Sequence, residues 1–161
     1  LHERLPTVTA LRQLLEEEVA VVRSFVGLLE REQRLLIEGD VDGLPALLQD
    51  KNELAARLAV IAEQRRATLA ADGLSADRAG VAAWFAAHPG EEDARTAWAE
   101  LLPLATQARE LNRLNGEVIQ LRLQSNAQAI AALVGSSGAL GLYGPDGQSR
   151  PGGSGRISDS A

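Results

Sequence analysis

The sequence lacks cysteine and methionine altogether, and it has only five aromatic residues and one lysine among its 161 positions. Without cysteine, the chain can form no disulfide, offer no thiolate nucleophile and bind no zinc through sulfur. Positive charge is not in excess either, because the formal net charge is −6, which argues against an open nucleic-acid-binding surface. No run approaches the roughly 18 uncharged apolar residues of a membrane span, and residues 1–10 are not typical of a signal peptide. We therefore expect a cytoplasmic protein that neither binds nucleic acid nor inserts into a membrane.

Alanine and leucine are abundant instead, with 53 residues together, and this composition favours helix. A first helix is predicted over residues 7–37, with Pro6 near its start, where proline is tolerated. Two apolar rows repeat every seven residues along it: Val8, Leu15, Val22, Leu29 and Leu36, and Leu14, Val21, Leu28 and Leu35. The next row contains Glu18 and Glu32, so two carboxylates flank an apolar stripe of the coiled-coil type.

A turn follows at residues 38–43, which hold two glycines and two aspartates. A second helix is predicted over residues 44–71, with Asp40 or Asp42 as its N-cap, Pro45 in its first turn and Gly73 after its end. The short connection makes the first two helices antiparallel neighbours, whose facing residues have a roughly constant index sum of 83.

That sum pairs Glu32 with Lys51 and Glu18 with Arg65, so each carboxylate meets a cation on the facing helix. We predict these two ion pairs, which would help to set the register of the hairpin. The alternative is that all four side chains are solvated at the edges of the interface, where such pairs contribute about 0–1 kcal/mol.

Two further helical segments are predicted. A short amphipathic one spans residues 75–87, with Ser75 as N-cap and Trp84 and Phe85 closing one end of the core. A long one spans residues 91–134, with acidic residues in its first turn and a kink or break expected near Pro103. The fold class is therefore all-α: an elongated antiparallel bundle of three long helices and a short one.

The second half of the last helix is apolar on two faces. One stripe comprises Leu111, Leu114, Val118 and Leu121, and the other comprises Ile119, Leu123, Ala127, Ile130 and Val134. Because the two stripes lie about 140° apart, only one of them can pack on the hairpin. The other is covered either by a further element of the domain or by another chain.

A glycine-rich tail follows the helical domain, which we place at residues 1–134. Residues 135–161 contain 8 of the 15 glycines, carry no net charge and cannot bury enough surface to fold alone, which predicts a disordered tail. The stretch 139–148 is more hydrophobic than a linker requires. It is either a short docking motif or merely residual hydrophobicity.

The sequence offers little catalytic chemistry. His88 precedes three acidic residues, but a loop histidine before an acidic helix start explains this pattern better than a metal site does. Phosphate-binding glycine motifs are absent, and no Glu-x-x-His pair suggests a di-iron bundle. We expect no enzyme, no metal and no cofactor, which leaves binding through helices as the class of function.

Two stretches resemble the FlgN family of flagellar export chaperones. They are Leu-Asn-Arg-Leu-Asn-Gly-Glu-Val-Ile at residues 111–119 and Leu-Tyr-Gly-Pro-Asp-Gly-Gln at residues 142–148. The order of the N-terminal features is also similar, so the resemblance covers essentially the whole chain.

The resemblance implies a cytosolic helical chaperone that binds the C-terminal helices of the hook-filament junction proteins FlgK and FlgL. Such a chaperone prevents premature assembly and delivers its clients to the export gate, including the cytoplasmic domain of FlhA. It also implies client contact in the C-terminal part of the chain and gate docking through Tyr143, with Leu142 and Gly144 beside it.

Periodicity selects the client-binding residues within that part. They are the second stripe and its polar neighbour: Ile119, Leu123, Asn126, Ala127, Ile130 and Val134. An amphipathic client helix would lay its apolar face on them. The alternative function is a self-associating structural or adaptor bundle without a chaperone role, and the chain itself is expected to be a monomer or weak dimer.

Overall fold

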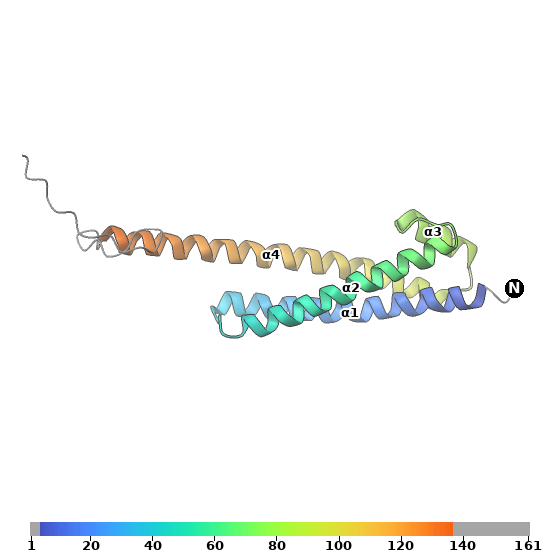
Figure 1. Ribbon diagram of the computed structural model, residues 1–161, viewed down its shortest axis with the longest axis horizontal. Helices are drawn as coiled ribbons and strands as arrows, with labels where there is room; N and C mark the ends of the chain where they lie inside the picture. Colours follow the sequence, from blue (N-terminus) through green and yellow to red (C-terminus); the bar gives the residue numbers. More distant parts are fainter. Residues whose placement is uncertain (1–3, 137–161) are drawn as a thin grey trace, which may run out of the picture. The chain divides into compact units, whose positions relative to one another are not determined.

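The computed structural model describes the backbone of residues 4–136 and the side chains of residues 8–135. In this part of the chain there are four helices and no strands: α1 (Arg4–Glu38), α2 (Leu44–Ala71), α3 (Arg78–Ala87) and α4 (Glu92–Ser136) (Figure 1). The all-α prediction of three long helices and a short one is confirmed. The predicted tail lies almost entirely outside the described residues.

Helix α1 is buried on two sides, which accounts for its several apolar rows. Leu15, Val22 and Leu29 belong to a core cluster shared with α3 and α4. Val21 and Leu28 are also buried, but outside that cluster. The antiparallel α1–α2 pair makes the most extensive helix-to-helix contact in the described chain. A helix with neighbours on both sides needs more than one apolar stripe.

Both arms of the hairpin end on a glycine in the left-handed conformation. Gly39 and Gly73 each have a φ of 73°. The backbone N–H of the residue after each glycine donates to a carbonyl five residues earlier, from Asp40 to Leu35 and from Leu74 to Leu69. This is the Schellman arrangement, which satisfies carbonyls at the end of a helix.

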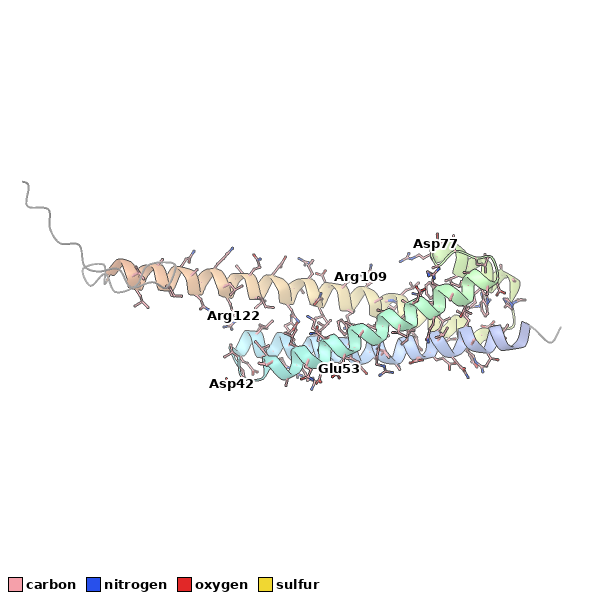
Figure 2. All side chains as sticks on the ribbon, in the orientation of Figure 1. Asp42, Glu53, Asp77, Arg109 and Arg122 are labelled. Carbon is pink, nitrogen blue, oxygen red and sulfur yellow. The ribbon has the colours of Figure 1, made fainter. Side chains whose placement is uncertain are left out.

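The predicted N-caps are wrong at two helices. Gly43, not Asp40 or Asp42, precedes α2, and no side chain caps that helix. Proline near its start already removes one of the N–H groups that a cap would satisfy. Figure 2 shows Asp42 in the turn between α1 and α2 and Asp77 at the start of α3.

At α3 the N-cap is Asp77, so this helix begins three residues later than predicted from Ser75. The Asp77 carboxylate accepts from the backbone N–H of Gly80 at 2.9 Å and from the Ser75 hydroxyl at 2.6 Å. The carboxylate is an acceptor for both donors, so it takes the capping position and Ser75 supports it from outside the helix. Trp84 and Phe85 are buried in the core, as expected.

A kink or break was predicted near Pro103, and the break is wrong, because helix α4 continues through this residue. Leu101 and Ala108 are buried on either side of the proline, and their packing offsets the lost helix hydrogen bond. The packed stripe of α4 also differs from the predicted one. Its members recur at intervals of three and four residues and include a polar position: Ala94, Ala97, Leu101, Leu104, Ala108, Leu111, Asn115 and Val118. Leu121, predicted to continue the packed face, is exposed.

The chain divides into two compact units, one up to Val118 and one from Ile119 onward. In the first unit, α4 runs parallel to α1, because Arg23 pairs with Glu100 and Leu29 further along contacts Asn115. All buried residues of the core cluster lie in this unit. The described part of the second unit is the remaining length of α4.

Candidate functional site

The predicted client-binding residues lie on one exposed face of α4 beyond Val118. Ile119, Leu123, Ile130 and Val134 are all exposed, and so are Asn126 and Ala127 between them. The intervals of three and four residues place them on the same side of the helix. Nothing in the described chain buries this face, so a further covering element is not found there.

The predicted gate-docking residues Leu142, Tyr143 and Gly144 lie outside the described residues. Their role stays a prediction from the resemblance.

A buried polar cluster joins three helices in the first unit. The Lys51 ammonium on α2 donates to both carboxylate oxygens of Glu32 on α1, at 3.2 and 3.4 Å. The Asn115 amide on α4 donates to Glu32 Oε1 and to the Leu29 carbonyl, both at 2.9 Å. Glu32 therefore accepts from two helices at once, and the predicted Glu32–Lys51 pair is confirmed.

Sequence reasoning missed the burial of Asn115, which is only 1% exposed. The signal was present, because Asn115 falls four residues after Leu111 and three before Val118 on the packed stripe. A polar residue on an apolar row needs a partner when it is buried. Its Oδ1 has no hydrogen-bond partner among the described residues, so the amide acts here as a donor.

The second predicted pair, Glu18 with Arg65, is also confirmed. Glu18 Oε2 lies 3.1 Å from Arg65 Nε, although the two groups are not aligned for a hydrogen bond. The Arg65 guanidinium also lies over the Trp98 ring, 5.6 Å from its centroid. Burial raises the pKa of the Glu18 carboxyl, and the charge of Arg65 opposes this rise. Both acidic side chains are less than 10% exposed, so neither pair is solvated at the edge of the interface.

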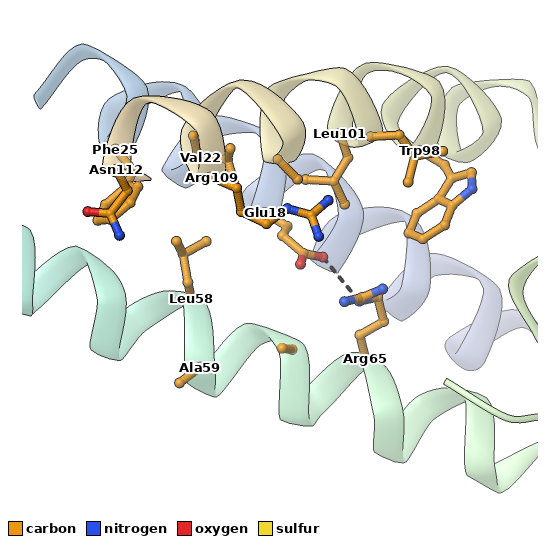
Figure 3. Close-up of a pocket in the computed structure, with 14 residues that line it drawn as sticks. Glu18, Val22, Phe25, Leu58, Ala59, Arg65, Trp98, Leu101, Arg109 and Asn112 are labelled. Carbon is orange, nitrogen blue, oxygen red and sulfur yellow. Dashed lines mark ion pairs between the residues drawn. The ribbon is translucent and has the colours of Figure 1, made fainter. Parts of the chain in front are cut away.

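Beside this pair, α2 and α4 leave a cavity of about 470 Å³ with α1 behind it (Figure 3). Val22 and Phe25 contribute from α1, and Leu58 and Leu101 from the two flanking helices. The space stays open because several facing positions carry only a methyl group: Ala59, Ala62, Ala105 and Ala108. We call this cavity the α2–α4 groove.

The described residues include no group of three or more metal-ligating side chains. His88 is held instead by Trp84, on whose ring it stacks with centroids 4.3 Å apart and whose carbonyl lies 2.8 Å from its Nδ1. None of the helices between Arg4 and Ser136 has the length and apolar character needed to cross a membrane.

Comparison with known proteins gives a consistent result. The family model described as FlgN protein matches residues 7–151. The flagella synthesis protein FlgN of Yersinia enterocolitica is 28% identical over 145 residues, which cover 89% of this chain and 91% of that protein. The proteins of the same name from Proteus mirabilis and Salmonella typhimurium are each 25% identical, over 87% and 88% of this chain and 90% and 91% of their own lengths. No solved structure matches the chain significantly.

Proposed function

The chain belongs to the FlgN family, and on this premise we propose that it is a cytoplasmic export chaperone of flagellar assembly. Its relatives are flagella synthesis proteins, which supports a role in building the flagellum. Its clients are the hook-filament junction proteins FlgK and FlgL, whose C-terminal helices it binds. It keeps them from assembling early and brings them to the export gate, where it meets the cytoplasmic domain of FlhA.

The exposed apolar face of α4 carries this proposal. Ile119, Leu123, Ala127, Ile130 and Val134 form a continuous aliphatic strip with no partner in the described chain. An amphipathic helix that lays its apolar side on this strip buries both surfaces from water. Selectivity then depends on polar neighbours such as Asn126, because aliphatic side chains discriminate little among apolar partners.

The test exchanges one exposed residue on each side of α4. Ile130→Asp places a carboxylate in the proposed interface, and we expect it to weaken binding of the purified FlgK or FlgL C-terminal segment by more than about 100-fold. Leu121→Asp is the matched control, because Leu121 and Ile130 are 63% and 61% exposed and nine residues apart, hence on opposite sides of the helix.

Calorimetric titration measures the binding, and circular dichroism checks that both variants keep their helix. Equal losses in the two variants would contradict a client surface confined to the Ile130 side. Tyr143→Ala should spare client binding and weaken binding to the FlhA cytoplasmic domain. Loss of both interactions would exclude separate surfaces.

The alternative of a self-associating bundle uses the same exposed strip and is distinguished by sedimentation of the free chain at several concentrations. A sedimentation mass equal to that of one chain at every concentration would exclude the self-associating bundle. A dimer that Ile130→Asp dissociates would favour it over the chaperone role.

A further inference from the structure

The α2–α4 groove is a second surface that could bind a partner, and its residues are different from those of the exposed strip of α4. Its volume of about 470 Å³ lies within the range of roughly 300–1,000 Å³ that is typical of binding pockets. Along α4 its lining extends from Trp98 to Asn112, which corresponds to about 21 Å of helix. It is therefore long enough for several turns of a docked helix.

The charges that line the groove are not balanced. Glu18 is paired with Arg65, and Arg65 is held further by the Trp98 ring. Arg109 reaches into the same space from α4 (Figure 3), and no ion pair or hydrogen bond satisfies its guanidinium within the described part of the chain. The groove thus carries a net charge of +1 on a chain whose formal net charge is −6.

The apolar lining and the excess positive charge together indicate which partner the groove would bind. The Arg109 guanidinium is exposed at the side of this apolar groove, where it pairs best with a carboxylate, and a docked partner that covers the pair from water strengthens it. The walls around Ala59 and Ala105 are lined by methyl groups, so they can pack against aliphatic side chains of a partner but offer no hydrogen bond to polar ones. A second copy of this chain is disfavoured because two chains of net charge −6 repel each other.

We propose that the α2–α4 groove is a second docking surface for the client, which places aliphatic side chains between α2 and α4 and a carboxylate on Arg109. This inference rests on the proposed chaperone function. It adds that the client is held by two surfaces, one aliphatic on α4 beyond Val118 and one apolar with a cationic side in the first unit.

The test uses the full chain, labelled with nitrogen-15, and the purified C-terminal segment of FlgK or FlgL as the probe. Trp84 and Trp98 are the two tryptophans, so the spectrum holds two indole N–H signals. Trp98 lines the groove, whereas Trp84 is fully buried in the core. Added client segment should shift the Trp98 signal and leave the Trp84 signal in place. Trp98→Phe assigns the two signals.

Arg109→Gln should weaken client binding about tenfold, because it removes one charge-assisted hydrogen-bond partner. Arg113→Gln is the matched control, since Arg113 lies one turn further along α4, outside the groove lining, and already pairs with Glu110 and Glu117. It should leave client affinity unchanged.

The proposal is overturned if the client binds and Ile130→Asp abolishes binding, but the Trp98 signal stays and Arg109→Gln has no effect. In that outcome the chaperone function survives. Failure of the client segment to bind the full chain at all contradicts both proposals. A Trp98 signal that moves with the concentration of the free chain identifies a second copy as the occupant. A Trp98 signal that moves when residues 137–161 are removed identifies the chain's own C-terminal segment as the occupant. Either result excludes the client as the occupant of the α2–α4 groove.

Discussion

Glu32 is the residue at which three helices of the first unit are joined. Its carboxylate accepts from Lys51 on α2 and from Asn115 on α4. The Lys51 contact follows from the antiparallel register and was predictable from residue numbers alone. The Asn115 contact was not, because the register between α1 and α4 depends on how α3 reverses the chain, and no sequence pattern fixes that reversal.

Charge reversal tests the cluster. We expect Glu32→Lys to lower the free energy of unfolding by about 3 kcal/mol, because it removes the acceptor of the buried Asn115 amide and the partly buried Lys51 ammonium and places two cations together. Adding Lys51→Glu should restore only part of the loss, since the reversed pair leaves Asn115 without its carboxylate acceptor. Urea denaturation of the single and double variants measures both effects. If the double variant recovers the full free energy of unfolding, the hydrogen bond between Asn115 and Glu32 does not contribute to stability.

Glu18 makes stability depend on pH in the direction opposite to most acidic residues. Since burial raises the pKa of its carboxyl, the folded state favours the protonated form, and its stabilising contribution is lost as pH rises through the folded pKa. The Glu18→Gln variant has no carboxyl group to ionise at this position, so it does not lose this stability as pH rises. The variant should therefore gain stability relative to the original chain as pH rises above the ordinary carboxyl pKa of 4.5, measured by urea denaturation at each pH. A difference that is constant or falls with pH contradicts the effect.

Among the elements, α2 matches its predicted bounds because a proline near its start and a glycine after its end mark the helix clearly. Prediction was less accurate where tertiary packing competes with local signals. Pro103 does not end α4, since buried neighbours on both sides of it maintain the helix. At α3, Ser75 and Asp77 were both capable of capping, and only the structure shows that Asp77 reaches the N–H of Gly80.

The start of α3 allows no side chain at Gly80. A Cβ added there would overlap the Ser75 carbonyl oxygen, so the backbone before the helix would have to move. We expect Gly80→Ala to destabilise the protein by about 2 kcal/mol through this displacement and the strained Asp77 cap. Gly27→Ala is the matched control, because the added methyl group meets open space in the middle of α1 and should stabilise by about 0.5–1 kcal/mol. The midpoints of thermal unfolding of the two variants test this expectation. Equal changes in the two midpoints would refute the steric argument.

At the scale of the whole molecule, the exposed strip of α4, to which we assign client binding, takes no part in the core, whereas the α2–α4 groove shares residues such as Val22 and Leu101 with it. The buried core cluster ends at Ala108, and the exposed strip of α4 begins at Ile119. Sequence periodicity located the strip because an apolar face without a neighbour is visible in the sequence. The groove could not be predicted, because it depends on the distance between two helices that both pack on a third.

Removal of residues 119–161 tests this division. The shortened chain keeps every buried residue of the core and the Glu32–Lys51–Asn115 cluster. We expect its midpoint of thermal unfolding to stay within about 3 °C of the full chain, because exposed residues contribute little to stability. Binding of the FlgK or FlgL segment should fall sharply. Loss of cooperative unfolding would show that the second half of α4 supports the fold.

The spacing of the two ion pairs limits how the length of such a chain can evolve. Glu18 and Glu32 lie two heptads apart on α1, and their partners Lys51 and Arg65 lie two heptads apart on α2. Deleting one residue between either pair rotates the helix beyond it by about 100° and turns one charge away from its partner. Between the two pairs, a change of length that keeps both contacts therefore adds or removes the same number of whole heptads in both arms, whereas α4 beyond Val118 can change length without disturbing either pair.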